Sequence, residues 1–221
     1  MSAHANPNIV TDGLVLIADA GDPKSYPGSG STWYDRSGNG NNGTLTNGAS
    51  WSSENGGIME CDGIDDYILF NLNLNYTNAK YTVMAAARYS GDTRARVITT
   101  NSNSNNWLLG WWSNRADVYY ALGWVSSSNG GGTNAADKNY WHIYAGTGDK
   151  EADSYQLFKN GAALFNANSS GSGGPSSLKI GGWTSSERST CQCKLIIAYD
   201  RVLTAAEIAQ NSNALKSRFE L

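Results

Sequence analysis

Charged residues are scarce in this chain, and its basic residues form no cluster. Only 16% of the 221 residues are charged, and the formal net charge is −3. A protein that binds nucleic acid usually presents a basic stripe to the phosphates. The sequence contains no run of Lys and Arg, so we expect no nucleic-acid partner.

Long apolar runs are also missing. No stretch of about 18 apolar residues occurs, the length that would predict a membrane-spanning helix. Residues 1–8 are polar and lack the charged segment and apolar core of a secretory signal peptide. We therefore expect no membrane insertion, and we recognise no signal peptide.

Cysteine and histidine are too few for most covalent or metal frameworks. The three cysteines are Cys61, Cys191 and Cys193, and an odd count does not make a disulfide framework. Cys191 and Cys193 would point to the same face of a strand and could not easily bridge each other. Cys61 could pair with either of them in space. A metal site would need further Cys or His nearby, and His142 is the only internal histidine. We expect all three cysteines to be plain packed or exposed thiols.

Glycine and aromatic residues are abundant instead. The chain has 25 Gly but 4 Pro, together with 8 Trp and 12 Tyr. Glycine and asparagine favour tight turns, while aromatic residues favour strands. The apolar patterns predict many short strands and a hairpin at Asn160-Gly161, where Asn-Gly suits a type I′ turn. The predicted strands are 13–19, 43–46, 58–61, 66–72, 81–89, 96–100, 107–112, 117–124, 140–146, 154–159, 163–166, 178–181 and 193–199. This pattern predicts an all-β fold, a sandwich of two antiparallel sheets.

One helix is predicted, at the C-terminal end. Thr204 and Glu207 form a capping box, and Ile208, Leu215 and Phe219 follow at helical spacing, which predicts a helix over about 204–218. We expect it to pack on the sandwich, with an oligomer contact as the alternative. Residues 1–12 are predicted to be an exposed tail, and 13–221 a single domain because no linker divides them.

Four motifs in order resemble one known superfamily. They are WYDRSGNGNNGTL from Trp33 to Leu45, CDGIDDYI from Cys61 to Ile68, LFKNG from Leu157 to Gly161, and IIAYDRVLTAAEI from Ile196 to Ile208. Together they resemble the concanavalin A-like lectin/glucanase superfamily in its laminin G-like form, over roughly residues 13–219. The resemblance implies a jelly-roll sandwich with a short C-terminal α-helix. It also implies that Arg201, within the last motif, pairs with an acid.

The resemblance implies several functions, because the superfamily contains lectins, adhesion modules, glycosidase accessory domains and some enzymes. The Gly/Ser/Asn-rich loops are similar to those of such domains in phage structural and tail proteins. We expect a non-catalytic carbohydrate-binding adhesion module whose partner is a glycan or polysaccharide, and the resemblance implies a module of this kind on a phage particle. One alternative is a structural domain of a virion or assembly without a ligand, as a homo-oligomer or bound to virion proteins. The expected location is extracellular or on the virion surface.

The expected glycan site draws on the aromatic residues in the middle of the chain. Tryptophan and tyrosine rings stack on the C–H faces of sugars, and polar side chains at the strand ends hydrogen-bond their hydroxyls. Alternation places Trp111 and Trp112 on opposite faces of a strand, and does the same for Tyr119 and Tyr120, so about half of these rings belong to the core. The predicted ligand-binding residues are Trp111, Trp112, Tyr119, Trp124, Asn106 and Arg115.

Two groups of oxygen-bearing side chains are candidates for a structural Ca²⁺. Calcium takes six to eight oxygen ligands. The candidates are Asp19, Asp35 and Asn39 in one group, and Asp62, Asp65 and Asp66 in the other. Related sandwiches often hold such an ion. The alternative for the second group is that the carboxylates stabilise their own turn by accepting backbone N–H groups.

Catalysis is the remaining alternative, as a polysaccharide lyase or a glycoside hydrolase. A glycosidase needs two carboxylates on one face of a strand, and the nearest pattern, Glu60-Cys61-Asp62, falls in a turn motif. A lyase would need His and Tyr with a cation beside them. His142 and Tyr144 share a strand face, and Arg88 is the candidate cation, so these three are the catalytic candidates.

Overall fold

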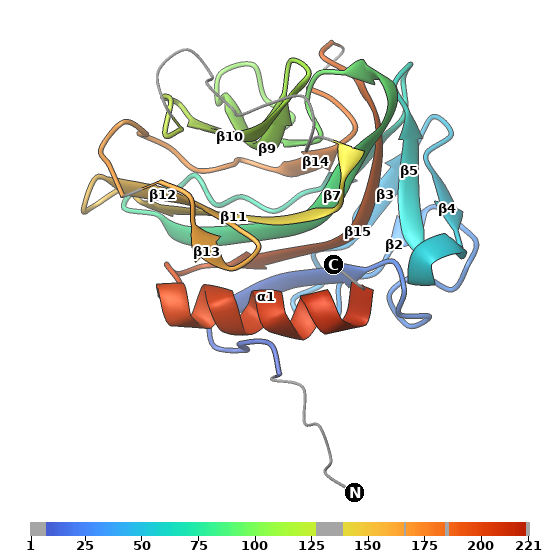
Figure 1. The fold of residues 1–221 in the computed structure, drawn as a ribbon, viewed down its shortest axis with the longest axis horizontal. Helices are drawn as coiled ribbons and strands as arrows, with labels where there is room; N and C mark the ends of the chain where they lie inside the picture. The colour runs from blue at the N-terminus through green and yellow to red at the C-terminus, as the bar shows by residue number, and fades with distance from the viewer. Residues whose placement is uncertain (1–7, 127–138, 166, 184–185, 220–221) are drawn as a thin grey trace, which may run out of the picture.

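The predicted antiparallel sandwich is confirmed. A computed structural model describes residues 8–126, 139–165, 167–183 and 186–219, which form two antiparallel sheets and a C-terminal helix (Figure 1). One sheet has eight strands in the order β13-β12-β11-β7-β15-β5-β4, with β1 also paired to β15. Its strands are β1 (Leu14–Asp19), β4 (Ser50–Ser52), β5 (Ile58–Asp62), β7 (Lys80–Arg94), β11 (His142–Asp149), β12 (Ser154–Lys159), β13 (Ala162–Ala163) and β15 (Ser189–Tyr199).

The other sheet has seven strands in the order β10-β9-β8-β14-β6-β3-β2. Its strands are β2 (Thr32–Trp33), β3 (Gly43–Thr46), β6 (Tyr67–Phe70), β8 (Ile98–Thr99), β9 (Trp107–Trp112), β10 (Arg115–Ala121) and β14 (Leu178–Ile180). A 3-10 turn, Glu54–Gly56, joins β4 to β5. Sequence patterns locate most of these strands, but not the very short β2 and β4, which have too few residues for an alternation to show.

The core lies between the two sheets and is rich in aromatic rings. Trp107 and Tyr119 from the seven-stranded sheet meet Tyr81 from the eight-stranded sheet, and all three side chains are fully buried. Their polar ends bond to one another: the Tyr81 and Tyr119 hydroxyls are 2.8 Å apart, and the Trp107 indole N–H donates to the Tyr81 hydroxyl at 3.2 Å. Buried polar groups need such partners, so these rings both fill the core and fix how the sheets face each other.

Helix α1 (Ala205–Phe219) covers the outer face of the eight-stranded sheet, opposite the core (Figure 1). Ile208 and Leu215 are buried there against a second apolar cluster that includes Ile143, Phe158 and Ile197 of the sheet. The side chain of Phe219, predicted to share their face, is outside the described residues. The predicted packing of the helix on the sandwich is therefore observed for Ile208 and Leu215.

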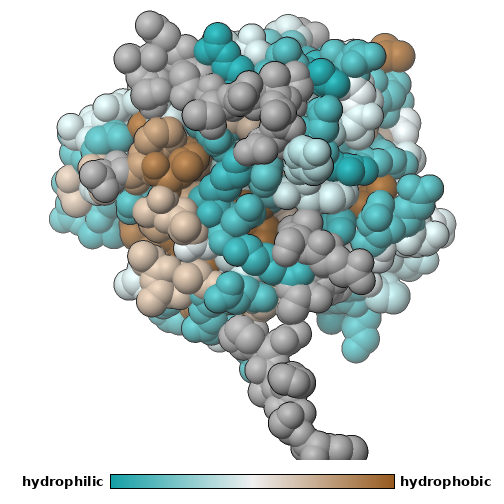
Figure 2. All heavy atoms as spheres, in the orientation of Figure 1, coloured by the Kyte–Doolittle hydropathy of each residue, from teal (hydrophilic) through white to brown (hydrophobic). Residues whose placement is uncertain are grey.

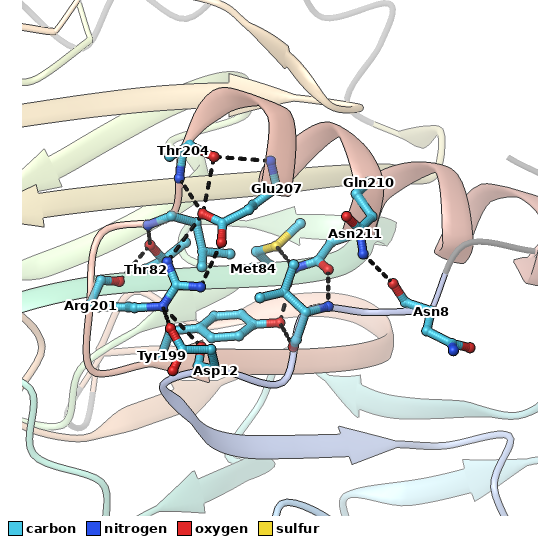
Figure 3. A network of polar contacts seen from close by, with 12 residues as sticks. Asn8, Asp12, Thr82, Met84, Tyr199, Arg201, Thr204, Glu207, Gln210 and Asn211 are labelled. Atoms are coloured by element: carbon cyan, nitrogen blue, oxygen red, sulfur yellow. Dashed lines mark hydrogen bonds and ion pairs between the residues drawn. The ribbon is translucent and has the colours of Figure 1, made fainter.

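The capping box at the start of α1 forms as predicted. The backbone N–H of Thr204 donates to the Glu207 carboxylate at 2.8 Å, and the Glu207 N–H donates to the Thr204 hydroxyl at 3.3 Å (Figure 3). The two oxygens of Glu207 also accept from the Arg201 guanidinium at 3.1 and 2.7 Å. Arg201 forms a further ion pair with Asp12 at 2.9 Å. The predicted pairing of Arg201 with an acid is thus confirmed.

The segment just before β1 is hydrogen-bonded to this helix and to the end of β15. The Val10 N–H donates to the Asn211 side-chain oxygen at 2.8 Å, and the Tyr199 hydroxyl donates to the Val10 carbonyl at 2.9 Å (Figure 3). Of the tail predicted over residues 1–12, positions 1–7 lie outside the described residues. Asn8 and Asp12 are exposed, but Val10 is half-buried against the apolar cluster under α1. The end of the predicted tail is therefore part of the packed structure.

We expect this network to make stability depend on acid pH through Glu207. The hydrogen bonds from Arg201, followed by that from Thr204, lower the pKa of the Glu207 carboxyl from 4.5 to about 2. A carboxyl group whose pKa is lowered by folding contributes its full stabilisation at pH values above its unfolded-state pKa. This contribution is lost as the pH falls towards the folded-state pKa. Glu207→Gln should therefore cost about 1–2 kcal/mol of unfolding free energy at pH 7, a magnitude reduced for the partial exposure of the pair. The cost should shrink towards zero near pH 2. Urea denaturation of both proteins at several pH values measures this, and a cost that is the same at pH 2 and pH 7 would contradict it.

On the face of the molecule that Figure 2 shows, most of the described residues are hydrophilic. Figure 2 also shows that the hydrophobic residues of this face gather mainly in one patch at the left. No helix among the described residues is long and apolar enough to cross a membrane.

Candidate functional site

A group of partly exposed aromatic rings lies on the outer face of the seven-stranded sheet. Side chains alternate along a strand, so Trp112 of β9 and Tyr120 of β10 point outward while Trp111 and Tyr119 point into the core. Trp124, just after β10, packs against both outward rings, with centroid distances of 5.1 Å to Trp112 and 4.9 Å to Tyr120. All three outward rings are partly exposed. They form one end of what we call the aromatic face.

A buried arginine joins this group to a further tryptophan. The Arg96 guanidinium lies over the Trp183 ring at 4.2 Å and donates to the Asn106 side-chain oxygen at 2.6 Å. It also forms an ion pair with Glu187. The other carboxylate oxygen of Glu187 accepts from the Trp112 indole N–H at 3.1 Å. The aromatic face therefore consists of Arg96, Asn106, Trp112, Tyr120, Trp124, Trp183 and Glu187.

Arg96 contacts Trp183, Asn106 and Glu187, and its own side chain is only 4% exposed. Burial lowers the pKa of its guanidinium, and the charge of Glu187 counteracts the shift. An arginine keeps its charge in proteins even so, and its planar group can hold a carboxylate and an aromatic ring at once. The chain thus places a fixed positive group behind the exposed rings.

A second basic group adjoins the face at β14 and β6. Lys179 points out of the sheet, since its neighbours Leu178 and Ile180 are in the core. Its amine lies 4.1 Å from the Tyr67 ring centroid and donates to the Asn101 side-chain oxygen at 3.1 Å. Arg188 lies over the same ring at 5.7 Å. Burial, assisted by the charge of Arg188, lowers the pKa of Lys179 to about 8.

This combination of groups suits a saccharide. Partly exposed tryptophan and tyrosine rings offer apolar surface with polar edges, which complements the C–H faces and hydroxyls of a sugar. Asn106 and Glu187 supply acceptors at the same place, and Arg96 orients both of them. The described residues of the aromatic face include no pair of carboxylates, which glycoside hydrolysis would use.

The structure divides the predicted ligand-binding residues into two groups. Trp112, Trp124 and Asn106 belong to the aromatic face, and the exposed Arg115 lies opposite Trp112 in the strand register. Trp111 and Tyr119 were predicted at the site, and this is wrong, because both side chains are fully buried in the core.

Arg96, Glu187 and Trp183 were missed as a group. Of these, only Trp183 carried a sequence signal, because its place beside a Gly-Gly loop indicated exposure. Arg96 and Glu187 lie far apart in the sequence, and each looks like an ordinary charged residue there.

The three catalytic candidates do not come together in the structure. His142 pairs with Ala87 in the register of β11 and β7, and Ala87 is in the core, so Arg88 must point to the opposite face. His142 and Tyr144 share the core side as predicted, but Tyr144 is fully buried. Its hydroxyl donates to the carboxylate of Asp117. The predicted lyase-like grouping of His142, Tyr144 and Arg88 is therefore corrected.

Arg88 belongs to a polar row on the outer face of the eight-stranded sheet. Its guanidinium donates to the Gln192 side chain at 2.8 Å, and Gln192 donates to Glu60 at 2.7 Å. Two hollows of about 490 and 410 Å³ adjoin this row and share Ser90 and Gln192. Among the described residues, the lining of the two hollows includes one aromatic residue, Tyr89, and its side chain is buried. These hollows lack the exposed stacking surface that the aromatic face offers.

One of the two predicted calcium groups comes together. Carboxylate oxygens of Asp62, Asp65 and Asp66 lie within 4.8 Å of one another, and they form the one such group of three among the described residues. The turn uses some of these oxygens: Asp62 accepts from the Ile64 N–H at 2.7 Å, and Asp66 from the Asp62 N–H at 3.1 Å. Each carboxylate has a second oxygen, so the donor set also suits a hard cation. Burial, then the charges of Asp62 and Asp65, raises the pKa of Asp66 against the opposing backbone hydrogen bond.

The other predicted calcium group is arranged as loop support. Asp35 accepts from the backbone N–H groups of Ile17 at 3.1 Å, Ser37 at 2.8 Å and Asn41 at 3.0 Å. Asp19 accepts from the Gly21 N–H at 2.9 Å, and Asn39 donates to a backbone carbonyl. Their described contacts are those of turn-stabilising side chains, and they join no three-carboxylate group among the described residues.

Comparison with known proteins identifies the fold but no family. No protein-family model matches the chain. No curated protein matches it either.

Several solved structures share the fold at low sequence identity. The chain is similar to a Trypanosoma rangeli sialidase in complex with the inhibitor DANA, with a TM-score of 0.64, 15% identity, and coverage of 92% of this chain and 33% of that one. It is also similar to the binding domain of Paraclostridial Mosquitocidal Protein 1, with a TM-score of 0.66, 15% identity, and coverage of 93% and 53%. The botulinum neurotoxin serotype D binding domain gives a TM-score of 0.63, 13% identity, and coverage of 92% and 52%. The chain thus spans a third to about half of these proteins, and the likeness shows a jelly-roll β-sandwich fold.

Proposed function

We propose that the chain is a non-catalytic, lectin-like module that binds a glycan on the aromatic face. The observation that supports this most is the group of partly exposed rings at Trp112, Tyr120 and Trp124, fixed from behind by Arg96 and Glu187. Rings held by packing and hydrogen bonds lose little conformational entropy when a ligand stacks on them. The similar solved structures include a sialidase and the binding domain of a mosquitocidal protein, and this likeness also supports a glycan ligand.

The class of glycan follows from the charges beside the rings. Arg188 is partly exposed and lies over Tyr67, with the buried Lys179 amine close to the same ring, so this place would attract a carboxylate. One similar solved structure is a sialidase in complex with sialic acid. We therefore propose that acidic sugars, sialylated ones included, bind better than neutral ones. A structural calcium ion at Asp62, Asp65 and Asp66 is part of the same proposal.

A glycan array with sialylated, uronate-containing and neutral glycans tests the function. We expect binding by the native chain, and a loss of about tenfold in affinity for Trp124→Ala, since one stacked ring contributes on the order of 1.4 kcal/mol. Tyr76→Ala is the matched control, because Tyr76 is 46% exposed and lies outside the aromatic face. It should bind as the native chain does. Repeating the array with a chelator tests the calcium proposal separately.

The glycan proposal fails if no glycan is bound, or if Trp124→Ala binds as well as Tyr76→Ala. The finer proposal, a laminin G-like adhesion domain on a phage particle, is supported by the sequence motifs alone. A particle component would form a trimer or ring in light scattering, and a monomer would count against it.

A further inference from the structure

Two of the three cysteines lie directly opposite each other in the eight-stranded sheet. Cys61 of β5 is the register partner of Cys191 of β15, and the two strands are antiparallel. Residues directly opposite in an antiparallel pair have Cα atoms about 4.5–5.5 Å apart, which is within the range that a disulfide requires. Both side chains point into the core. We propose that Cys61 and Cys191 are an oxidisable pair that forms a disulfide between β5 and β15.

The surroundings of Cys61 and Cys191 are closely packed. The Cys61 sulfur packs against Gly181, where an added Cβ atom would lie only 2.7 Å from it. A hydrogen bond with Cys61, followed by burial, raises the pKa of the Cys191 thiol. In the folded chain all three cysteines are free, and Cys61 and Cys191 lie opposite each other on the core side of the sheet.

Cys193 is excluded from the pair by the same register. It lies opposite Met59, not Cys61. A diagonal neighbour across two strands is about 7–8 Å away, which is beyond normal disulfide geometry. The Cys193 thiol instead donates to the Leu195 carbonyl at 3.5 Å. Of the two pairings that the sequence leaves open for Cys61, the structure favours Cys191.

The oxidation needs an electron acceptor, and oxidised glutathione is a suitable one. One cysteine thiol loses its proton to solvent, and the resulting thiolate attacks the glutathione disulfide. This forms a mixed disulfide and releases one glutathione as a thiolate, which takes up a proton from solvent. The second cysteine then displaces the other glutathione. Two protein thiols are oxidised, and one glutathione disulfide is reduced to two thiols. Because buried thiols with a raised pKa are seldom ionised, the reaction should be fast during folding and slow in the folded, reduced protein.

The crosslink should raise stability strongly, because it joins positions about 130 residues apart. Closing so long a loop in the unfolded chain is among the more effective ways in which a disulfide stabilises a fold. For a protein of this size we expect the oxidised form to melt about 10 °C above the reduced form.

The experiment refolds the reduced, denatured full chain in two buffers, one with oxidised and reduced glutathione and one with dithiothreitol. We expect one reactive thiol in the denatured oxidised product, three in the reduced product, and the higher melting temperature for the oxidised product. Three thiols in both products, or an oxidised form that melts no higher, would overturn the proposal.

Mapping must separate Cys191 from Cys193, since both occur in the tryptic peptide 189–194. Cys193→Ala should keep the crosslink and the rise in melting temperature, whereas Cys191→Ala should lose both. Fragmentation of the crosslinked peptide from the native chain gives the same answer without any variant. A bond from Cys61 to Cys193 in that spectrum would refute the assignment.

Discussion

Replacing Arg96 with methionine should weaken the fold and remove glycan binding together. Methionine keeps much of the side-chain length but leaves Glu187 without the cation beside it and Asn106 without its donor. Breaking a buried ion pair by removing one partner costs about 3–5 kcal/mol. We expect a cost of about 3 kcal/mol, towards the low end because Glu187 is 32% exposed. Urea denaturation and glycan titration measure the two effects.

Arg94→Met is the matched control, two positions earlier in the chain. The Arg94 side chain is 21% exposed, against 4% for Arg96, and its partner Asp92 is fully exposed. An exposed pair contributes less than about 1 kcal/mol, so this variant should keep both its stability and its ligand.

The double variant Arg96→Met/Glu187→Gln separates charge from shape. Without the carboxylate there is no unpaired charge, so it should recover about 1–2 kcal/mol of the lost stability. Glycan binding should stay low, because Asn106 still lacks its donor and Trp183 still lacks the guanidinium that lies over its ring. If Arg96→Met and Arg94→Met were equally stable, Arg96 would not have the role described.

Alanine substitution of two adjacent tryptophans, Trp111 and Trp112, should lower stability by very different amounts. Trp111 is fully buried and packs edge-on against Tyr144 at 4.7 Å, so Trp111→Ala should cost about 3–5 kcal/mol through a cavity in the core. Trp112 is partly exposed on the aromatic face, so Trp112→Ala should cost about 1 kcal/mol or less. Melting temperatures and urea midpoints measure both.

The ligand titration should show the reverse order. Trp112→Ala should lose about tenfold in glycan affinity, whereas the fraction of Trp111→Ala that stays folded should bind as the native chain does. If Trp112→Ala destabilised the chain as much as Trp111→Ala, or left glycan affinity unchanged, the division into core and binding face would be wrong.

Alternation in the sequence separated Trp111 from Trp112 but could not say which of them faces the core. The period of a strand divides its residues into two faces, and both faces of β9 carry large side chains. Only the second sheet, packed over Trp107 and Trp111, decides which face is buried. The prediction that included Trp111 and Tyr119 in the site failed for this reason.

The grouping of His142, Tyr144 and Arg88 failed for a related reason. The shared face of His142 and Tyr144 follows from their spacing and is correct. The face of Arg88, however, depends on the register between β7 and β11, which sets His142 opposite Ala87. Register is a relation between distant segments, and nothing in either segment alone specifies it.

The aromatic face joins segments that are distant in the sequence. Arg96 meets Glu187 and Trp183 because β8 and β14 are neighbours in the seven-stranded sheet, although about 80 residues separate them. Cys61 meets Cys191 because β5 pairs with β15. Neither meeting has a local sequence signal.

The sequence by itself determined the features that depend on neighbouring residues. Strand alternation and Gly/Asn turns specified two antiparallel sheets, and Thr204 with Glu207 specified the start of α1, because these depend on local backbone geometry and nearby hydrogen bonds. The tertiary structure alone decided which face of each strand is buried, which cysteines lie opposite each other, and which charges support the exposed rings. These depend on strand order and register, which are set by the packing of the whole core and not by any one segment.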